Sequence, residues 1–548
     1  MRISFLKRRG EQGSVPHSKW ILLSLVSGAM LTALTLVFPT VGFLEWITMI
    51  PLFLGVFWLC DAPKAGWLKC YGFGFLTVFA YYFIIYHWFL QLYPLDFVGL
   101  DNGASVAVVL VGWLGLSLLQ ALPGGLIFVF YRLISKSGVF ERLPLAKPFV
   151  FSALWVIFEW FSTLTWTGVP WGRLCLGQIK LLPMLQLSSA FGSYAVSFLL
   201  LAVNGLLAYG LLYHRRRMAC VITAASLLVG NLLFGLIWLG TDIPSTETLR
   251  AAVVQGNINS HDKWDSESDE RTMEIYAELT AEAAKEGAEL VVWPETAIPY
   301  ILNEDDYFMD YVTDVAMENN VTLIVGALYD GEEGYFNSLY LVTPDGEISE
   351  ERYDKRHLVP FGEYVPLRDL ITALVPPLAE LSALEDDLDA GADSNLFSTQ
   401  WGEIGSMICF DSIYEALGRD SVRDGADLMV ISSNDSWFRD SAAVYQHRAQ
   451  GQIRAIEEGR YVLRSANTGI SAVITPKGEM MSEIEPLVDG YAVCEVASIE
   501  RNTLYMRIGN LFVYLCIAFC VGLPLLGLSL KTEIVAKMRR RFRKKDRL

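Results

Sequence analysis

The sequence predicts two folds in one chain, a bundle of membrane-spanning helices and an α/β domain. Of 548 residues, 53% are hydrophobic and the mean hydropathy is +0.36, values typical of a chain that lies partly in a bilayer. Apolar runs alternate with amphipathic stretches in the second half, as in α/β domains. The charge is also divided sharply along the chain, which indicates parts with different surroundings.

The net charge of −17 is a sum over unlike parts. Residues 1–247 carry 16 Lys and Arg against 9 Asp and Glu, and residues 531–548 carry 9 against 2, so each flank has a net charge of +7. Residues 248–530 carry 18 against 49, a net charge of −31. Such an acidic block argues against nucleic acid as a partner.

Eight apolar runs are long enough for a hydrocarbon core of about 30 Å. They lie near residues 20–38, 42–60, 66–93, 104–131, 148–165, 188–212, 218–240 and 508–530. If the N-terminus is cytoplasmic, the inner segments hold 14 Lys and Arg and the outer loops hold two, which favours that orientation. The acidic block then lies outside the cytoplasm, and the basic tail returns to the inner face.

This pattern predicts four parts. We expect a transmembrane domain of about seven helices over 1–247 and an extracytoplasmic catalytic domain over 248–505. A C-terminal transmembrane helix over 506–530 and a basic cytoplasmic tail over 531–548 follow. Within the first part, the outer loop from Trp166 to Arg173, which contains Trp171, has the composition of an interfacial aromatic anchor.

The α/β domain is predicted from apolar strands that alternate with helices. Helices are expected near 266–286 and 304–319. Strands are expected at 249–254, 290–293, 321–326, 404–409, 428–432, 461–464 and 471–475. This order implies a largely buried sheet with helices on its faces.

The cysteines and histidines give no support for a cofactor. None of the eight cysteines forms a Cys-x-x-Cys pair, and no His-Glu-x-x-His spacing occurs. We therefore expect neither a disulfide framework nor a metal site. Cys409 and Cys494 are the two cysteines within the acidic block.

Three strand ends in the acidic block carry reactive side chains. Glu295 follows Val-Val-Trp-Pro, Lys355 opens Lys-Arg-His-Leu-Val-Pro-Phe-Gly-Glu-Tyr-Val-Pro, and Cys409 follows Ser-Met-Ile. A thiol nucleophile needs a base, and attack on a carbonyl needs a positive group for the oxyanion. Each residue alone is more often structural, as core filler, helix cap or solvated charge. Their joint occurrence at element boundaries favours chemistry.

These stretches resemble the nitrilase superfamily, and within it the apolipoprotein N-acyltransferase family, over essentially the whole chain. The same resemblance includes Val-Val-Gln-Gly-Asn-Ile ending at Ile258, Ser-Asn-Asp-Ser-Trp-Phe ending at Phe438, Gln446-His447 and Arg-Ser-Ala-Asn-Thr-Gly ending at Gly469. It implies an α-β-β-α sandwich for the α/β domain. It also implies a thioester acyl-enzyme.

The resemblance assigns Glu295 as general base, Lys355 as oxyanion-stabilising cation and Cys409 as nucleophile. Glu363 matches a further acidic position that orients the triad or the incoming amine, with a loop carboxylate as the structural alternative. Trp264 matches a position near the site, with ordinary packing as its alternative.

Three positions depart from the family pattern. Phe410 and Asp411 stand where the family usually has Tyr-Glu, and we place both among the substrate-binding or supporting residues. Arg439 stands where a glycine is common. These departures leave the triad intact and affect substrate preference and rate.

The implied activity is transfer of an acyl chain from a phospholipid donor to the N-terminal amino group of a diacylated apolipoprotein acceptor. It implies a multi-pass protein of the bacterial cytoplasmic (inner) membrane whose partners include the lipid bilayer. One alternative is a membrane-tethered amidase or nitrilase acting on a small C–N substrate. Another is a catalytically silent scaffold, against which the intact triad argues.

The stretch from Leu367 to Leu384 is unusually apolar for a loop of an acidic domain. We expect either a mobile lid that touches the bilayer and guides acyl chains, or a helix on the domain core.

Overall fold

The computed structural model describes residues 16–545, apart from 63–64, 96–99, 165–166, 260–268, 333, 370–372 and 374–386, with side chains as far as residue 529. The chain forms two compact units. The helical unit comprises Met1–His87, Trp113–Trp238 and Ile508–Leu548, and the α/β unit comprises Trp88–Gly112 and Leu239–Arg507. The segment from Trp88 to Gly112 therefore groups with the α/β unit, although it lies far from it in the sequence.

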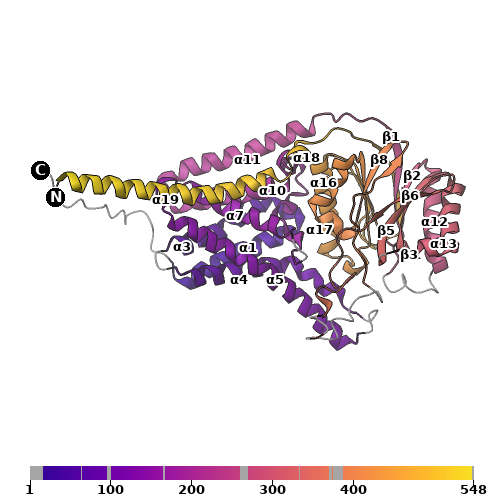
Figure 1. Ribbon diagram of the computed structural model, residues 1–548, viewed down its shortest axis with the longest axis horizontal. Helices are drawn as coiled ribbons and strands as arrows, with labels where there is room; N and C mark the ends of the chain where they lie inside the picture. The colour runs from indigo at the N-terminus through magenta and orange to yellow at the C-terminus, as the bar shows by residue number, and fades with distance from the viewer. Residues whose placement is uncertain are drawn as a thin grey trace. The chain divides into compact units, whose positions relative to one another are not determined.

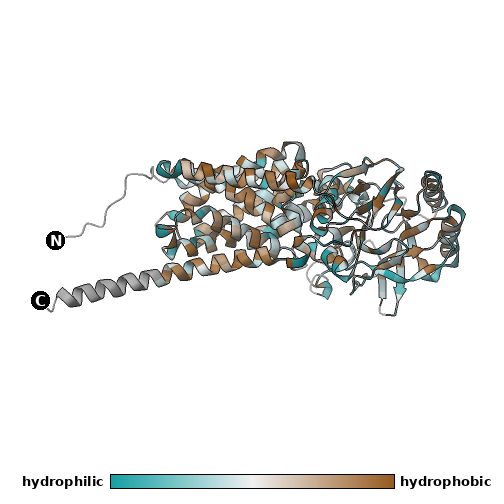
Figure 2. Cartoon of the chain, turned by 90° about the horizontal axis from the view of Figure 1, so that it is seen from above, coloured by the Kyte–Doolittle hydropathy of each residue, from teal (hydrophilic) through white to brown (hydrophobic). Residues whose placement is uncertain are grey.

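The apolar runs form long helices (Figure 1). Their bounds are α1 Ser18–Val37, α3 Ile50–Asp61, α4 Trp67–Ile85, α5 Asn102–Lys136, α7 Ala146–Phe161, α10 Ser193–Leu212, α11 Arg217–Leu239 and α19 Leu511–Lys545. Apolar residues predominate along the helices of the helical unit in Figure 2.

Seven helical segments of the described chain are long and apolar enough to cross a membrane. They coincide with seven of the eight predicted spans. The remaining prediction, 148–165, coincides with α7, whose 16 residues make about 24 Å of helix. The chain is therefore a membrane protein with a helical region of about the predicted size.

The loop around Trp171, predicted as an outer interfacial anchor, is buried in the helical unit, which contradicts that prediction for its described residues; Trp166 lies outside them. Trp171 and Arg173 are only 2% and 1% exposed. The backbone N–H of Leu174 donates to Glu159 Oε1 at 3.0 Å, and Gln178 Nε2 donates to Glu45 Oε2 at 2.7 Å. Because a buried carboxylate needs hydrogen-bond partners, these contacts draw the loop inward.

The α/β unit contains two sheets. The first has the order β13-β1-β2-β4-β5-β6, with β3 also paired to β4, and the second has the order β12-β11-β10-β9-β8-β7. The bounds of the first sheet are β1 Thr248–Gln255, β2 Leu290–Val292, β3 Ile298–Ile301, β4 Thr322–Gly331, β5 Gly334–Val342, β6 Ile348–Asp354 and β13 Gly490–Ala497. Those of the second are β7 Phe397–Thr399, β8 Gly402–Ile408, β9 Leu428–Ser433, β10 Val462–Ala466, β11 Ala472–Ile474 and β12 Met480–Glu483.

Helices cover the outer faces of both sheets, which makes the predicted α-β-β-α sandwich (Figure 1). The helices α12 Asp269–Lys285 and α13 Asp306–Asn319 pack on the first sheet, and α16 Glu415–Asp424 and α17 Ala442–Glu458 pack on the second. Parallel pairs lie at the centre of each sheet, β1 with β2 and β4 with β2 in one, β9 with β8 and β10 in the other. Parallel strands bring their carboxyl ends to one edge, where loops can gather functional groups.

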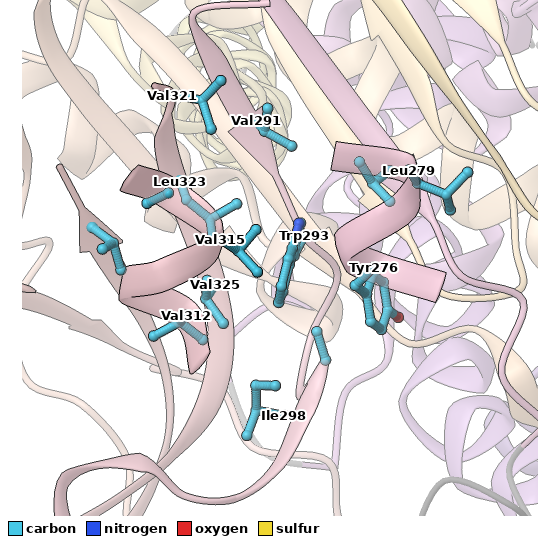
Figure 3. Packing of buried hydrophobic residues seen from close by; sticks show 14 of the residues in the cluster. Tyr276, Leu279, Val291, Trp293, Ile298, Val312, Val315, Val321, Leu323 and Val325 are labelled. Carbon is cyan, nitrogen blue, oxygen red and sulfur yellow. The ribbon is translucent and has the colours of Figure 1, made fainter. Parts of the chain in front are cut away.

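Three layers of core hold the sandwich together. One lies between the two sheets and includes Val253, Ile324 and Val430. Another lies between the first sheet and its helices, where Trp293 stacks on Tyr276 with ring centroids 5.0 Å apart (Figure 3). The third lies between the second sheet and its helices. Trp293 is thus fixed by packing two residues before Glu295.

Candidate active site

Glu295, Lys355 and Cys409 each follow a strand of the α/β unit. Glu295 comes three residues after β2, Lys355 directly after β6, and Cys409 directly after β8. The first two strands belong to one sheet and β8 to the other. The three side chains therefore come from both sheets of the sandwich.

The loop that carries Glu295 packs directly on the backbone of β4. A Cβ atom added to Gly326 would lie 2.5 Å from the carbonyl oxygen of Pro294 and 2.9 Å from the Cα atom of Glu295. Real Cβ atoms do not approach so closely, so only glycine fits at this position. The close approach fixes the height of Glu295 above the sheet.

Lys355 bridges two carboxylates inside the protein. Its side chain is 1% exposed, and its Nζ donates to Glu295 Oε1 and to Glu363 Oε1, both at 2.8 Å. Burial alone would lower the pKa of Lys355, but the charges of Glu295 and Glu363 outweigh burial and raise this pKa well above its usual value. Lys355 is therefore a fixed positive charge at neutral pH.

Asn337, on β5, joins the same network and was not found from the sequence. Its Nδ2 donates to Glu295 Oε1 at 2.8 Å and to Glu363 Oε1 at 3.0 Å. Its backbone carbonyl accepts from the backbone N–H of Lys355 at 2.8 Å. Asn337 therefore fixes the positions of Glu295, Glu363 and Lys355 relative to one another.

Cys409 lies at a sharp turn between β8 and the 3-10 helix Cys409–Ile413. Its φ is +50°, in the left-handed region that costs a non-glycine residue free energy. Burial and the charge of Glu295 raise the pKa of the thiol, and Lys355 offsets this only in part. The resting thiol is therefore protonated and needs a base at the moment of attack.

Glu295, which the resemblance assigns as the general base, lies buried beside Lys355 and Asn337. Its Oε1 accepts from Lys355 and Asn337, and its Oε2 accepts from the backbone N–H of Asn434 at 2.7 Å. Both oxygens of the carboxylate are thus oriented by fixed donors. The side chain is 7% exposed, which limits competition from bulk water.

Asp411 ties the turn of Cys409 to the loop of Lys355. It is fully buried and accepts from the backbone N–H of Ile408 at 3.1 Å, from that of His357 at 2.7 Å and from the hydroxyl of Tyr353 at 2.9 Å. Burial raises the pKa of Asp411 to about 6, although Lys355 and these hydrogen bonds oppose the rise. Its position is that of a supporting residue behind the thiol.

A second buried network holds the backbone of Cys409. His447 Nε2 lies 3.0 Å from the carbonyl oxygen of Cys409, and His447 Nδ1 lies 2.8 Å from Asp435 Oδ1. Arg464 donates to Asp435 Oδ2 at 2.7 Å. His447, Asp435 and Arg464 all lie in motifs that resemble the family, but the resemblance assigns none of them a role.

Cys409, Asp435 and His447 also place three donor atoms within 4.8 Å of one another, as a metal site would. These donors are committed to other partners, because His447 binds Asp435 and the Arg464 guanidinium already neutralises that carboxylate. A metal ion would have to displace this internal cation. The donor set therefore does not fit a resident metal.

Phe410 lies beside the site in an aromatic cluster. Its ring contacts Tyr414 edge to face, with centroids 5.4 Å apart, and lies 5.8 Å from His357. His357 in turn stacks on Tyr414 at 3.7 Å. Phe410 is partly exposed, so it can contact a substrate as well as pack.

A segment from the first half of the chain reaches this part of the α/β unit. Trp88 packs edge to face on Phe438 with centroids 4.9 Å apart, and Phe438 lies 6.5 Å from His447. No motif of the sequence predicts this contact. Trp264 and most of the predicted lid, namely residues 370–372 and 374–384, lie outside the described residues.

Residues 250–501 match the carbon-nitrogen hydrolase family. The α/β unit is therefore a carbon-nitrogen hydrolase domain, with a buried glutamate-lysine pair near a cysteine. Residues 27–206 match the N-terminal domain of apolipoprotein N-acyltransferase.

Curated relatives extend this match to the whole chain. The apolipoprotein N-acyltransferase of Gloeobacter violaceus is 33% identical over 95% of this chain and 96% of its own. That of Geobacter metallireducens is 31% identical over 91% of this chain and 93% of its own, and that of Azotobacter vinelandii is 30% identical over 89% and 91%. The chain belongs to the apolipoprotein N-acyltransferase family and is a membrane-bound enzyme.

Proposed function

We propose that this protein transfers an acyl chain from a phospholipid to the α-amino group of an S-diacylglyceryl cysteine at the N-terminus of an apolipoprotein. The observation that carries the proposal is the buried Glu295–Lys355 ion pair near Cys409, in a chain whose other unit consists of membrane-spanning helices. Both substrates are confined to a bilayer, so a membrane anchor gives each a high effective concentration at the site.

In the first half-reaction Glu295 accepts the proton of Cys409 Sγ as the sulfur attacks the ester carbonyl of the phospholipid. Lys355 stabilises the negative charge that forms on the carbonyl oxygen. When the tetrahedral intermediate collapses, the ester C–O bond breaks and the leaving alcohol takes the proton from Glu295. The products are lysophospholipid and an acyl thioester on Cys409.

In the second half-reaction the amino group of the apolipoprotein attacks the thioester. A C–N bond forms, the C–S bond breaks, and the proton lost by nitrogen returns through Glu295 to Cys409 Sγ. The Oδ1 atom of Asn337 is a buried acceptor with no hydrogen-bond partner among the described residues. We assign this atom to an N–H of the incoming amine, with Glu363 beside it.

The charge distribution supports a sidedness for the site. We propose that the catalytic domain, 248–505, faces the extracytoplasmic side and that both termini are cytoplasmic, joined by transmembrane segments over 1–247 and 506–530. The basic residues of the flanks favour the inner side of the membrane. The donor phospholipid and the diacylated acceptor then meet the site at the outer surface.

The deciding experiment incubates the purified full-length protein with phospholipid and a synthetic diacylated lipopeptide. Mass spectrometry should detect a lipopeptide that has gained one acyl chain, and an enzyme thioester when the lipopeptide is omitted. Cys409→Ala should abolish both signals. Cys494→Ala, a cysteine of β13 that is also partly buried, is the matched control and should retain both.

Product formation by Cys409→Ala would contradict the proposal. Absence of acyl transfer by the wild type, together with cleavage of a small amide or nitrile, would support the amidase alternative instead.

A further inference from the structure

A groove opens on the helical unit between α7, α10 and α19, and no residue of the candidate active site lines it. Its volume is about 640 Å³, within the range of about 300–1,000 Å³ that is common for small-molecule sites. Its wall is mainly apolar, with Leu515, Phe519 and Leu523 contributed by α19. Two arginines, Arg142 and Arg216, are also part of its lining.

Three phenylalanines form one end of the groove. Phe198 of α10 lies 6.3 Å from Phe149 of α7 and 5.4 Å from Phe512 of α19, measured between ring centroids. Phe512 is the second residue of α19, so this aromatic end lies at the start of that helix.

The arginines lie toward the other end of α19. Arg142 is the last residue of the short helix α6, Val139–Arg142. The start of α6 touches α19 near Gly527, where an added Cβ atom would lie 3.1 Å from the backbone nitrogen of Val139. Phe512 and Leu523, at the two ends of the α19 wall, are eleven residues apart, or about 16 Å along the helix axis.

This length is about that of one extended acyl chain, and the wall runs from near the start of the apolar span Leu511–Ser529 toward its arginine end. The groove can therefore hold one extended acyl chain of a lipid whose headgroup lies at the arginine end. A chain that filled the groove would contact α7, α10 and α19 together.

The two arginines differ from other basic residues of this region. Lys147 is paired with Asp61 and is 11% exposed. Arg142 and Arg216 are exposed, and neither guanidinium has a hydrogen bond or ion pair with any side chain that the structure describes. Guanidinium groups bind phosphate oxygens in bidentate fashion, so two of them at the mouth of an apolar groove complement an anionic lipid headgroup.

We propose that this groove is a binding site for one anionic phospholipid, distinct from the acyl donor. Its phosphate binds Arg142 and Arg216, and one acyl chain lies along the apolar wall between α7, α10 and α19. In the orientation proposed above, both arginines lie at the cytoplasmic surface, so this lipid comes from the inner leaflet. Basic pockets between membrane helices on this side are suited to anionic headgroups. The bound lipid fastens α19 to the rest of the bundle.

The test uses native mass spectrometry and thermal unfolding of the full-length protein in detergent. Cys409→Ala serves as the background, so that no lipid is consumed. The protein should retain one more molecule of dioleoyl phosphatidylglycerol than of dioleoyl phosphatidylcholine. Dioleoyl phosphatidylglycerol should also raise the Tm of the protein. In an R142Q/R216Q double variant this extra binding should weaken at least tenfold, whereas R215Q, an adjacent arginine that does not line the groove, should bind as before.

A second pair of variants tests the apolar half of the site. Leu515→Trp should fill the groove and weaken binding of phosphatidylglycerol, whereas Leu525→Trp should not. Both leucines are exposed on α19, by 58% and 61%, but only Leu515 lines the groove. Equal binding of both lipids, or unchanged binding in R142Q/R216Q, would overturn the proposal. An equal rise in Tm with inorganic phosphate alone would overturn the role of the acyl chain.

Discussion

At the scale of single residues, Cys409 lies between two buried networks with different tasks. Glu295 and Lys355 form a buried ion pair, as the proposed roles of proton acceptor and fixed positive charge require. His447 and Asp435 instead hold the backbone carbonyl of Cys409. The first network suits the exchange of a proton, and the second maintains the strained turn from which the thiol projects.

Asn337 offers a test of the first network. Asn337→Asp removes both Nδ2 donors and puts a third carboxylate beside Glu295 and Glu363, so charge repulsion should disturb the Lys355 contacts. Each lost hydrogen bond to a charged group is worth about 1.5–3 kcal/mol. We expect kcat for acyl transfer to fall by about 10- to 100-fold.

The control for this variant is Asn395→Asp, which loses a single exposed hydrogen bond to the carbonyl of Arg352. Its kcat should stay close to that of the wild type. Equal rates for Asn337→Asp and the wild type would show that Asn337 does not position the charged groups.

Asp411 should make stability depend on pH. Because burial raises its pKa to about 6, the folded protein binds this proton more tightly than the unfolded chain, in which the pKa is about 4. The contribution of Asp411 to the free energy of unfolding therefore falls as pH rises from about 4 to about 6, by about 3 kcal/mol, and is constant above that.

The measurement compares the Tm of the wild type with that of Asp411→Asn, which cannot titrate at this position. The wild-type Tm minus the variant Tm should decrease between pH 4 and 6 and stay level above pH 6.5. A difference that is independent of pH would contradict the assignment.

At the scale of elements, turns in the left-handed region recur around the site. Thr296 follows Glu295 with φ +44°, Cys409 has φ +50°, and Arg439 has φ +48° with ψ −149°. Cys409 and Arg439 directly follow β8 and the 3-10 helix Ser436–Phe438, and Thr296 lies in the loop between β2 and β3. The backbone of the site is therefore strained where its side chains are presented.

Arg439 is the position at which relief of strain should be measurable. The family often has glycine there, and the observed φ and ψ lie where glycine alone is relaxed. Arg439→Gly should stabilise the protein by about 1 kcal/mol, after the greater freedom of glycine in the unfolded chain is subtracted. Thermal unfolding should show a Tm higher by about 2–4 °C.

Arg439→Ala is the matched control, because it removes the same exposed side chain but keeps the Cβ atom. It should not raise the Tm. An equal rise in both variants would assign the effect to the arginine side chain and not to the backbone.

The elements that could be predicted are those whose pattern is local. The run Leu290–Trp293 and the amphipathic stretch 304–319 match β2 and α13 closely, since a buried strand and a two-sided helix follow from neighbouring residues. The prediction missed β13, which pairs antiparallel with β1 from Thr248↔Ala497 to Gln255↔Gly490. That pairing joins residues some 250 positions apart, and no local pattern encodes it.

At the scale of the whole molecule, charge should decide the orientation in the membrane. The basic flanks predict that Arg215 is cytoplasmic and that Glu350, in the acidic block, is outside. Single cysteines at these positions, in a background without Cys409 and Cys494, can be probed with an impermeant maleimide on spheroplasts. Glu350→Cys should react in intact spheroplasts, and Arg215→Cys should react only after the spheroplasts are permeabilised. The reverse pattern would overturn the proposed topology.

The candidate site was only partly predictable for a similar reason. Glu295, Lys355 and Cys409 stand at strand ends in recognisable motifs, so the sequence alone suffices to propose them as candidates. Asn337 and Arg464 lie within strands, where their types alone suggest nothing about proton transfer. An arginine in the apolar run Tyr461–Arg464 was the one available signal, since a buried arginine requires a counter-ion, here Asp435.

The protonated state of Cys409 has a further consequence for the lifetime of the enzyme. Oxidants and alkylating agents react with thiolates, and burial together with Glu295 keeps this sulfur as a thiol until a substrate arrives. In an oxidising compartment, the resting enzyme should therefore resist inactivation. At pH 7.5, iodoacetamide should inactivate the wild type much more slowly than it modifies free cysteine, whereas an inactivation rate equal to that of free cysteine would contradict this protection.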